Sequence, residues 1–580
     1  MANGVDRWIA VDRTRVVTVA AALGWVLAGV GMRGPSGAAL IGLGVLLLAA
    51  ALLRRQGRWA SDRVMQWLLD RDSVVSAGSQ RGDPQGDSGL GAVSGLLPQL
   101  HIVEARDRRN PPIATVGDGP GYAAVLEVHD GPDVRLPLTE LVSWATGDAA
   151  GLAGVQVLVE QTSPVDVGED FGPAIAYRRL PTNGLPLVVR TWIVLRHEPL
   201  RAVQAAAARG GGALGARTAL VAATARLRVR LAELGVRATA LSPAALRELL
   251  PMLGDPASVG EIRPEMWVTS HRGHCCLLAE VSSSAAWSAV LRAASGAQRS
   301  VVSLTVDCSG APAGSQAVVR LVARDPEQLE RARSTVVGTG HATPLLGKQG
   351  AGVVATLPLG AEVRVSVAAV EGNRKPGNTE RPRLDPPAAG VFLGTSRDSA
   401  PVAVTAVAAR PLRLGLVGGI DVARVLACRI LGAGCHLTVA TARREAWRPL
   451  QALAGAQRLT VVEQRASWPP VPGQPPNLGH GPQVLLVDLP DPPPRWVGRS
   501  PWCTVVHAVA RVPVDAEFWA TVDEVLVGSR GHGEVLARLL GNREVVRADE
   551  LGAGEIALCA RRRVVLGRLL VAPSEADLVS

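Results

Sequence analysis

The sequence predicts an α/β protein that is anchored in a membrane, and three observations support this fold class. Two uncharged apolar stretches, residues 16–32 and 37–53, lie near the start of the chain. Behind them, short β-like and helical segments alternate over most of the remaining length. Hydrophobic residues make up 47% of the 580 residues, so the part behind the two stretches is expected to contain large cores of its own.

Each apolar stretch is about 17 residues long, the short end of the length that crosses a bilayer core of about 30 Å. The residues between them, Arg33-Gly34-Pro35-Ser36, are typical of a turn. Residues 1–53 are therefore predicted to form a transmembrane hairpin in the inner (plasma) membrane, a multi-pass arrangement with two spans. Arginines flank the hairpin on both sides, so both termini are expected in the cytoplasm.

A buried core hairpin and a cleaved signal peptide are the two alternatives to this transmembrane hairpin. Core helices are rarely apolar on every side. A second apolar stretch follows the first at once, and no clear small-residue cleavage site precedes it. Both features favour the transmembrane hairpin.

Residues 54–96 are expected to connect the membrane to the rest of the chain. Residues 54–75 are predicted to form a helix that leaves the membrane, with Arg54, Arg55 and Arg58 near anionic lipid headgroups. Residues 76–96 are rich in Gly, Ser, Asp and Gln, which is typical of a flexible linker.

Residues 97–370 are predicted to form a cytoplasmic α/β domain. Alternating and β-branched patterns predict strands at 101–105, 123–128, 155–161, 190–196, 266–269, 276–281, 301–306 and 318–323. Helical periodicity predicts helices at 138–146, 214–234, 243–250, 285–294 and 326–337. Residues 371–400 are polar and proline-rich, which indicates a second linker.

Residues 401–580 are predicted to form a Rossmann-like α/β domain. Strands are expected at 413–417, 435–440, 459–462, 484–487, 504–506 and 524–527, and helices at 420–431, 443–453 and 530–540. Strands that alternate with helices in this way are typical of a parallel sheet.

The charge distribution argues against nucleic-acid binding. The chain carries 61 basic and 51 acidic side chains, a net charge of +10, but the two signs are interspersed. Aromatic residues are only 3%, whereas nucleic-acid surfaces combine clustered arginines with stacking rings. The seven cysteines show no paired ligand spacing and are expected to be free thiols.

One segment resembles a known family. Residues 191–217 (TWIVLRHEPLRAVQAAAARGGGALGAR) are followed by Arg226-Leu227 and then by Pro264-Glu265-Met266-Trp267. Behind a two-span hairpin, this arrangement resembles the EccE family, a membrane component of the type VII (ESX) secretion machinery of mycobacteria and related actinobacteria. The resemblance covers roughly residues 1–320.

The resemblance implies a place in a hetero-oligomeric complex with EccB-, EccC- and EccD-like subunits, of which EccC is the ATPase. It implies no catalytic residues and no cofactor. The 401–580 domain departs from the pattern of the family's shorter members, so its role is left open.

A nucleotide site is the main alternative for the 401–580 domain. Gly415, Gly418 and Gly419 lie where a predicted strand enters a predicted helix, the location of a dinucleotide phosphate turn. Arg443 and Arg444 follow the next strand, where they would suit a 2′-phosphate. However, the GxGxxG spacing is absent, and Asp421 would repel a pyrophosphate. These five residues are therefore weak candidates for cofactor binding.

Three other patterns resemble functional sites. Residues 484–488 (VLLVD) look like a Walker B strand, but no GxxxxGK[ST] loop exists to accompany it, so ATP hydrolysis is not expected. The cluster His271, His274, Cys275 and Cys276 has ligand types that suit zinc, although no second ligand pair stands out and a metal site is not predicted. Gly210-Gly211-Gly212 indicates either an anion nest or a helix break at a subunit contact.

Hydrolase signatures such as G-x-S-x-G and HExxH are absent. The sequence therefore predicts a non-enzymatic, membrane-anchored structural subunit of a type VII secretion complex that supports protein export. The alternative is a membrane-bound enzyme or binding protein that uses a nucleotide-type cofactor in the Rossmann-like domain.

Overall fold

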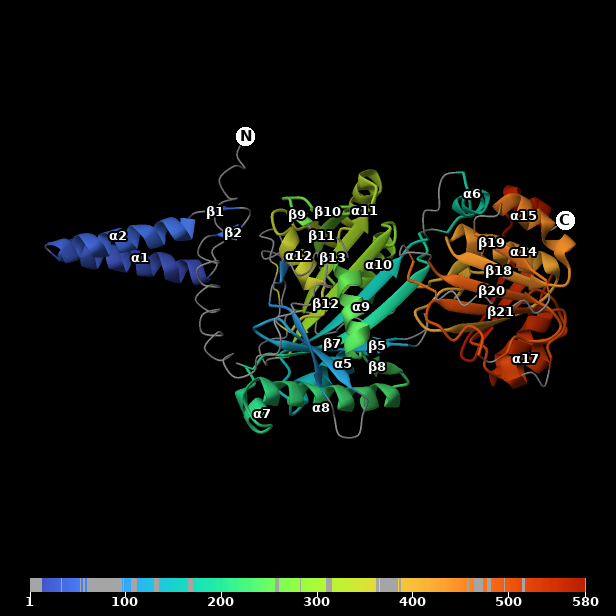
Figure 1. Cartoon of the computed structure of the whole chain (residues 1–580), viewed down its shortest axis with the longest axis horizontal. Helices are drawn as coiled ribbons and strands as arrows, with labels where there is room; N and C mark the ends of the chain where they lie inside the picture. The colour runs from blue at the N-terminus through green and yellow to red at the C-terminus, as the bar shows by residue number, and fades with distance from the viewer. Residues whose placement is uncertain are drawn as a thin grey trace.

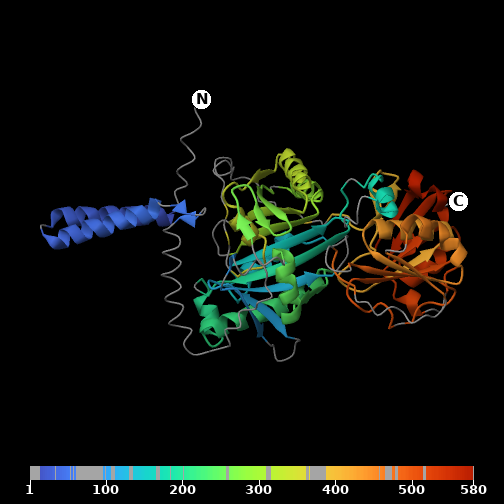
Figure 2. The ribbon, with the colours of Figure 1, turned by 45° about the horizontal axis from the view of Figure 1, so that its top comes forward.

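The computed structural model describes residues 13–59, 96–365 and 384–578, with short gaps inside each range. Along the chain it contains a pair of helices, a central sheet domain (96–365) and a C-terminal sheet domain (384–578) (Figure 1). The turned view separates the two sheets, with the blue-green and yellow strands of the central domain on one side and the orange and red strands on the other (Figure 2).

Helices α1 (Arg13–Gly31) and α2 (Pro35–Leu52) form an antiparallel pair. Gly29 and Gly44 allow the close approach, because a Cβ at Gly29 would lie 2.7 Å from the Gly37 carbonyl oxygen, and one at Gly44 would lie 2.8 Å from that of Ala22. The pair itself follows the predicted boundaries closely.

The predicted membrane spans are wrong for these helices. Within the described residues, no helix combines the length and the apolar character that crossing a bilayer requires. Two physical reasons account for the difference. Helix α1 begins with Arg13 and Arg15, which shortens its uncharged part. Helix α2 has 18 residues and at about 1.5 Å per residue extends about 27 Å, which leaves no margin for a core of about 30 Å.

The chain beyond α2 also differs from the prediction. Strands β1 (Arg54–Arg55) and β2 (Arg58–Trp59) pair in antiparallel fashion, where a helix was expected. The rest of that expected helix, and nearly all of the linker predicted at 76–96, lie outside the described residues. The linker predicted at 371–400 is described only from 384, and its last part contributes a strand to the C-terminal sheet.

The central domain repeats one motif, strand–helix–strand–strand–helix–strand. The first copy consists of β5 (Tyr122–Val128), α5 (Leu138–Gly147), β6 (Gly154–Thr162), β7 (Val188–His197), α8 (Gly212–Glu233) and β8 (Ala238–Ala240). The second consists of β11 (Gly273–Ala279), α10 (Ser284–Ala294), β12 (Arg299–Asp307), β13 (Ser315–Ala323), α11 (Pro326–Gly338) and β14 (Ala342–Pro344). When the four strands of each copy are numbered along the chain, their order across the sheet is 4-1-3-2. All neighbouring strands are antiparallel. This connectivity is that of the ferredoxin-like motif.

The two copies join through their second strands. Strands β6 and β12 pair antiparallel along their whole lengths, from Gly154 opposite Asp307 to Thr162 opposite Arg299. Four further strands extend the sheet to 12 strands: β3 (His101–Ala105), β4 (Ile113–Gly117), β9 (Gly260–Ile262) and β10 (Trp267–Thr269).

The α/β class is therefore wrong for the central domain, whose large sheet is antiparallel. The physical reason lies in the third strand of each motif. A strand–helix–strand unit predicts two parallel neighbours, but here β7 inserts between β5 and β6, and β13 inserts between β11 and β12. Every neighbouring pair thus becomes antiparallel, while the order of strands and helices along the chain stays similar.

Helices cover both faces of this sheet. Apolar residues of α5, α8, α10 and α11 share one core with the strands. On the other face, α9 (Pro243–Gly254) and α12 (Gln349–Ala355) close two smaller cores. Helix α7 (Val203–Ala207) precedes α8, and Gly210, Gly211 and Gly212 break the helical run between them with φ values of 100°, 71° and 56°.

The C-terminal domain is a ten-stranded mixed sheet. Its parallel strands are β17 (Leu412–Val417), β18 (His436–Thr441), β19 (Leu459–Val462), β20 (Gln483–Asp488), β21 (Cys503–Val509) and β22 (Glu524–Val527). Its antiparallel strands are β23 (Glu555–Ala560), β24 (Val564–Leu569), β15 (Val391–Ser396) and β16 (Pro401–Val404). Its helices include α14 (Ile420–Gly432), η2 (Arg444–Trp447), α15 (Arg448–Ala454), α16 (Glu517–Ala520), α17 (Gly533–Leu540), η3 (Arg543–Glu550) and η4 (Pro573–Leu578).

The strand order of this sheet corrects the Rossmann-like prediction. A dinucleotide-binding sheet places its first two strands side by side, in the order 3-2-1-4-5-6. Here β20 and β21 lie between β17 and β18, in the order β19-β18-β20-β21-β17-β22. The strands are parallel as expected, but they are not arranged as a Rossmann sheet, and nearly half of the sheet is antiparallel.

A short helix from the middle of the chain packs on the C-terminal domain. Helix α6 (Gly172–Arg178) lies between β6 and β7 in the sequence but contacts α14 and α15. The contact is close, because a Cβ at Gly432 would lie 2.5 Å from the Pro173 carbonyl oxygen. The backbone N–H of Phe392 also donates a 3.1 Å hydrogen bond to the Tyr177 hydroxyl. The two domains therefore share a core.

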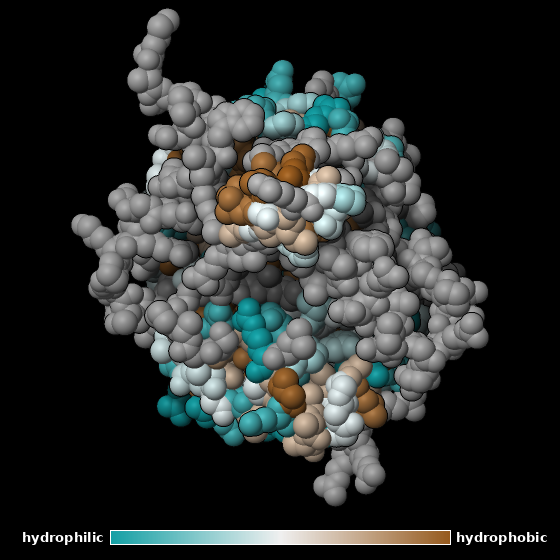
Figure 3. All heavy atoms as spheres, turned by 90° about the vertical axis from the view of Figure 1, so that its left-hand side faces the viewer, coloured by the Kyte–Doolittle hydropathy of each residue, from teal (hydrophilic) through white to brown (hydrophobic). Residues whose placement is uncertain are grey.

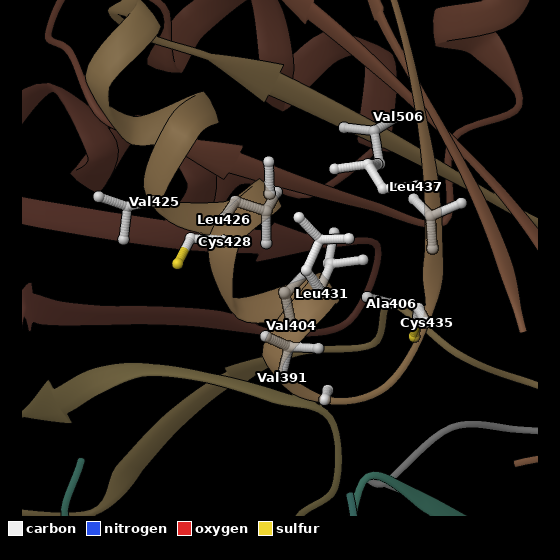
Figure 4. Packing of buried hydrophobic residues seen from close by; sticks show 14 of the residues in the cluster. Val391, Val404, Ala406, Val425, Leu426, Cys428, Leu431, Cys435, Leu437 and Val506 are labelled. Atoms are coloured by element: carbon white, nitrogen blue, oxygen red, sulfur yellow. The ribbon is translucent and has the colours of Figure 1, made fainter. Parts of the chain in front are cut away.

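Helix α14 is the centre of that shared core. Its residues Val425, Leu426, Cys428 and Leu431 are buried, and Leu431 lies close to Val404 and Val391 of the antiparallel strands (Figure 4). Tyr177 belongs to the same cluster, and burial raises the pKa of its hydroxyl to about 12.

A methyl group at the contact between α6 and α14 should destabilise the protein. Gly432→Ala is expected to lower the free energy of unfolding by about 1–3 kcal/mol, because the added Cβ overlaps the backbone of α6. The matched control is Gly338→Ala, since Gly338 is also the last residue of a helix and has open space around it. Thermal unfolding measures both variants. Equal melting temperatures would contradict the close packing.

Candidate functional site

The carboxyl edge of the parallel strands in the C-terminal domain is the place where such sheets bind ligands. At this edge β17 passes into α14 through Gly418 and Gly419. The Gly418 N–H donates to the Val509 carbonyl at 3.2 Å, and the Gly528 N–H donates to the Val417 carbonyl at 2.7 Å. A Cβ at Gly418 would lie 3.3 Å from the Cα atom of Gly528. The glycine at 418 is thus explained by the approach of two backbones.

Gly415 is explained by an aromatic ring. It lies within β17, and a Cβ there would lie 2.5 Å from the ring of Trp519. The indole N–H of Trp519 donates to Nδ1 of His507 at 3.0 Å, and Nε2 of His507 donates to the Leu489 carbonyl at 3.0 Å. Burial lowers the pKa of His507, which favours the neutral ring. The two hydrogen bonds engage both of its nitrogens.

Asp488, at the end of β20, is bound by three side chains. The Thr441 hydroxyl donates to it at 2.8 Å, and the Trp447 indole N–H donates at 2.9 Å. The Arg443 guanidinium forms an ion pair with the same carboxylate. Only 5% of the Asp488 side chain is exposed, compared with 59% of Arg443. The carboxylate therefore links β20 to the segment that follows β18.

The arginines proposed for a 2′-phosphate are not close to the glycines. Arg444 pairs with Glu463 at 3.1 Å and donates to the Val461 carbonyl at 3.3 Å, so it points toward β19. The end of β18 is three strand spacings from the end of β17, a separation of about 14 Å. The structure therefore does not bring the five candidate residues into one site.

The histidine–cysteine cluster is also separated. Cys275 and Cys276 are consecutive residues of β11, and their side chains belong to the cores on opposite faces of the sheet. His274 is buried and lies 3.0 Å from Asp255, whereas His271 is exposed in the preceding turn. In the described part of the chain, no three side chains of metal-binding type come together.

Sequence reasoning missed two sets of charged residues that the structure brings together. Arg429 of α14 and Glu575 of η4 form a fully buried ion pair. At the domain boundary, Arg190 pairs with Glu127 at 2.8 Å beside a cavity of about 210 Å³ that residues of both domains line, among them Val159 and Leu412. The only sequence signal for the first pair was an arginine within the apolar face of a helix.

Residues 186–278 match the family model described as "Putative type VII ESX secretion system translocon, EccE". The predicted resemblance to the EccE family is confirmed over this segment. The EccE segment, residues 186–278, runs through β7, α7, α8, β8, α9, β9, β10 and most of β11. It joins the second half of the first ferredoxin-like copy to the first strand of the second, and it excludes the C-terminal domain.

Among solved structures, the cytoplasmic domain of the Thermomonospora curvata type VII secretion ATPase EccC shows 17% identity and a TM-score of 0.23. The similarity covers 44% of this chain and 33% of that one, so the chain spans about one third of the length of that protein. A search of curated proteins finds no match.

Residues of the EccE segment that carried the resemblance have structural roles. Trp192 is buried in β7, with the Arg190 guanidinium 4.6 Å from its ring centroid. Arg226 of α8 forms a two-armed ion pair with Asp148, which follows α5, at 2.7 and 2.9 Å. These contacts fix the sheet and the helix packed on it.

The Asp488 contacts predict a clear mutational effect. Asp488→Asn is expected to lower the free energy of unfolding by about 1–3 kcal/mol, because the buried carboxylate loses its charge toward Arg443 and part of its hydrogen bonding. The control Glu463→Gln breaks an exposed pair and should cost less than about 0.5 kcal/mol. Denaturant titration of both variants measures this difference, and equal losses would argue against a structural Asp488.

His274 should make stability depend on pH. Burial, which outweighs the hydrogen bond that His274 donates to Asp255, lowers the pKa of His274 from 6.5 to about 4. Between these values the unfolded chain binds a proton that the folded chain excludes. Stability is therefore unaffected by this group above about pH 6.5 and falls between about pH 6.5 and 4, by at most about 3 kcal/mol.

The measurement is the free energy of unfolding at pH 7 and pH 5 for the wild type, for His274→Gln and for the exposed-site control His271→Gln. The wild type and the control should show the same pH dependence, and His274→Gln a weaker one. An unchanged slope in His274→Gln would refute the assignment.

Proposed function

We propose that this chain is a non-enzymatic structural subunit of a type VII (ESX) secretion complex. The observation that carries the proposal is the family match over residues 186–278, which identifies a type VII secretion component. The matched segment lies within a continuous sheet and its covering helices, so it supplies a rigid framework. We propose EccB-, EccC- and EccD-like subunits as its partners, in a hetero-oligomeric complex at the inner membrane.

The helix pair is the proposed contact with these partners. Several large apolar side chains of α1 and α2 are exposed, among them Leu27 at 72% and Val30 at 69%. Figure 3 views the molecule with the helix pair toward the reader, and brown apolar residues gather there. Exposed apolar patches of this kind mark contact surfaces. Apolar helices of neighbouring subunits would cover them, and anionic lipids near Arg54, Arg55 and Arg58 would be a secondary contact.

The non-enzymatic part of the proposal has support from the carboxyl edge of the C-terminal sheet. Two polar groups described there, Asp488 and His507, are engaged within the protein. Asp488 accepts from three side chains, and both ring nitrogens of His507 are hydrogen-bonded. A general acid or base directs a lone pair or a proton at its substrate, whereas these two groups are directed at partners within the protein.

Charged residues on the helix pair should disrupt assembly. Leu27→Glu with Val30→Glu is expected to reduce the yield of co-purifying complex by about tenfold or more, since a charge in an apolar contact costs more than about 1.4 kcal/mol. The measurement is a mild-detergent pulldown through a tag placed after Ser580, with quantitative mass spectrometry of the bound subunits.

The matched control is Leu346→Glu, because Leu346 is an exposed leucine of the central domain at 54%. This variant should retain the complex. If the wild type is recovered alone, the proposed function is wrong. Equal recovery of the complex with both variants would show that the helix pair is not the contact with the partner subunits.

A further inference from the structure

The strand order of the C-terminal domain identifies its fold more closely than the sequence did. Counted from β17 as the first strand, the sheet reads 3-2-4-5-1-6-7-8, from β19 to β24. Strands one to six are parallel, and the seventh, β23, is antiparallel to its neighbours. This is the strand order of RecA-type ATPase cores. Two extra strands, β15 and β16, extend the sheet beyond the eighth.

This order gives each position at the carboxyl edge a counterpart in a P-loop ATPase. The phosphate-binding loop of such a core joins the first strand to the first helix. The Walker B carboxylate that holds Mg²⁺ lies at the end of another parallel strand, the fourth, which the fifth strand separates from the first. Here the first position falls between β17 and α14. Asp488 ends the fourth strand, the position of the Walker B carboxylate, which agrees with the VLLVD pattern of residues 484–488.

The phosphate-binding position is closed in this chain. A P-loop needs eight residues, GxxxxGK[ST], whose backbone N–H groups surround the phosphates. Here only Gly418 and Gly419 separate β17 from α14. The Gly418 N–H is already used by the Val509 carbonyl. The first turn of α14 carries Asp421, paired with Arg424, where an ATPase carries its lysine.

The metal-binding position is also occupied by the protein's own side chains. Asp488 accepts from Thr441 and Trp447 and pairs with Arg443. These three residues lie at or after the end of the second strand and not near the first. Mg²⁺ would have to displace Arg443 from this carboxylate, since the guanidinium contacts both of its oxygens. Helix α14 is likewise fixed, because Arg429 is bonded to Glu575 and α6 packs against Gly432.

We infer that the C-terminal domain is a RecA-type ATPase core whose nucleotide site has been replaced by internal contacts. It binds no nucleoside triphosphate and acts as a rigid module. Its use as a module within a secretion complex rests on the proposed function, whereas the strand order and the closed site do not.

Strand order can be tested by cross-linking in the full-length chain. His436 of β18 and Gln483 of β20 are direct partners, so His436→Cys with Gln483→Cys should form a disulfide on mild oxidation. The matched control is His436→Cys with Arg413→Cys, which would link β18 to β17 as a Rossmann order requires. Peptide mapping without reduction separates these disulfides from ones that involve the native cysteines. A disulfide in the control pair, with none in the first, would overturn the inference.

Nucleotide binding is tested on the wild-type chain with Mg²⁺ and ATP, or Mg²⁺ and ADP, at millimolar concentration. A nucleotide at about 100 times its Kd would raise the melting temperature by several degrees. The expected shift is none. A rise of several degrees, abolished in Asp488→Asn, would show a working site and overturn the inference. Failure to recover the secretion complex in the pulldown would contradict only the proposed function.

Discussion

The buried ion pair between Arg429 and Glu575 is the interaction on which the C-terminal domain depends. Both side chains are fully buried, and the guanidinium meets the carboxylate with two hydrogen bonds of 2.9 and 3.0 Å. Arg429 also donates to the carbonyls of Phe392, Leu393 and Leu570. One side chain thus ties the first helix of the domain to η4 and to the antiparallel strands. Losing either partner would leave an unpaired buried charge, which costs about 3–5 kcal/mol.

The same helix joins the two domains. Arg429 holds α14 against the antiparallel strands. Gly432 follows nearly one turn later on the same side of the helix, so it is presented to α6 in a fixed position. Strand β7 also connects the two domains, because it contributes residues to the cores of both. Val188, at its start, belongs to the C-terminal core, whereas Ile193 and Leu195 belong to the core of the central domain. The EccE segment therefore begins in one core and continues into the other, and a force on the C-terminal domain reaches it through continuous packing.

Local elements of this fold could be predicted from the sequence, and long-range order could not. The expected helix 420–431 and strand 190–196 agree with α14 and β7 within a few residues, because apolar periodicity reflects burial in any context. The position of a strand in its sheet depends on partners far along the chain. Strand β17 pairs with β21, some 90 residues later, and its LGLV pattern would suit any buried neighbour. Glu575 is 146 residues from Arg429 and gives no local signal.

The glycine and carboxylate patterns at the strand ends show why a site is harder to predict than a fold. A glycine that lets a backbone approach a phosphate and one that lets it approach a ring or a second strand look identical in sequence. Gly415 makes room for Trp519 and Gly418 for Gly528, so neither faces a ligand. Asp488 is likewise committed to Thr441 and Trp447. Binding a ligand would add little favourable free energy at an edge whose polar groups are already hydrogen-bonded within the protein. Covering the exposed apolar face of the helix pair would add much more, because it removes apolar surface from water. The surface of the helix pair is therefore the part of the protein that a partner would stabilise most.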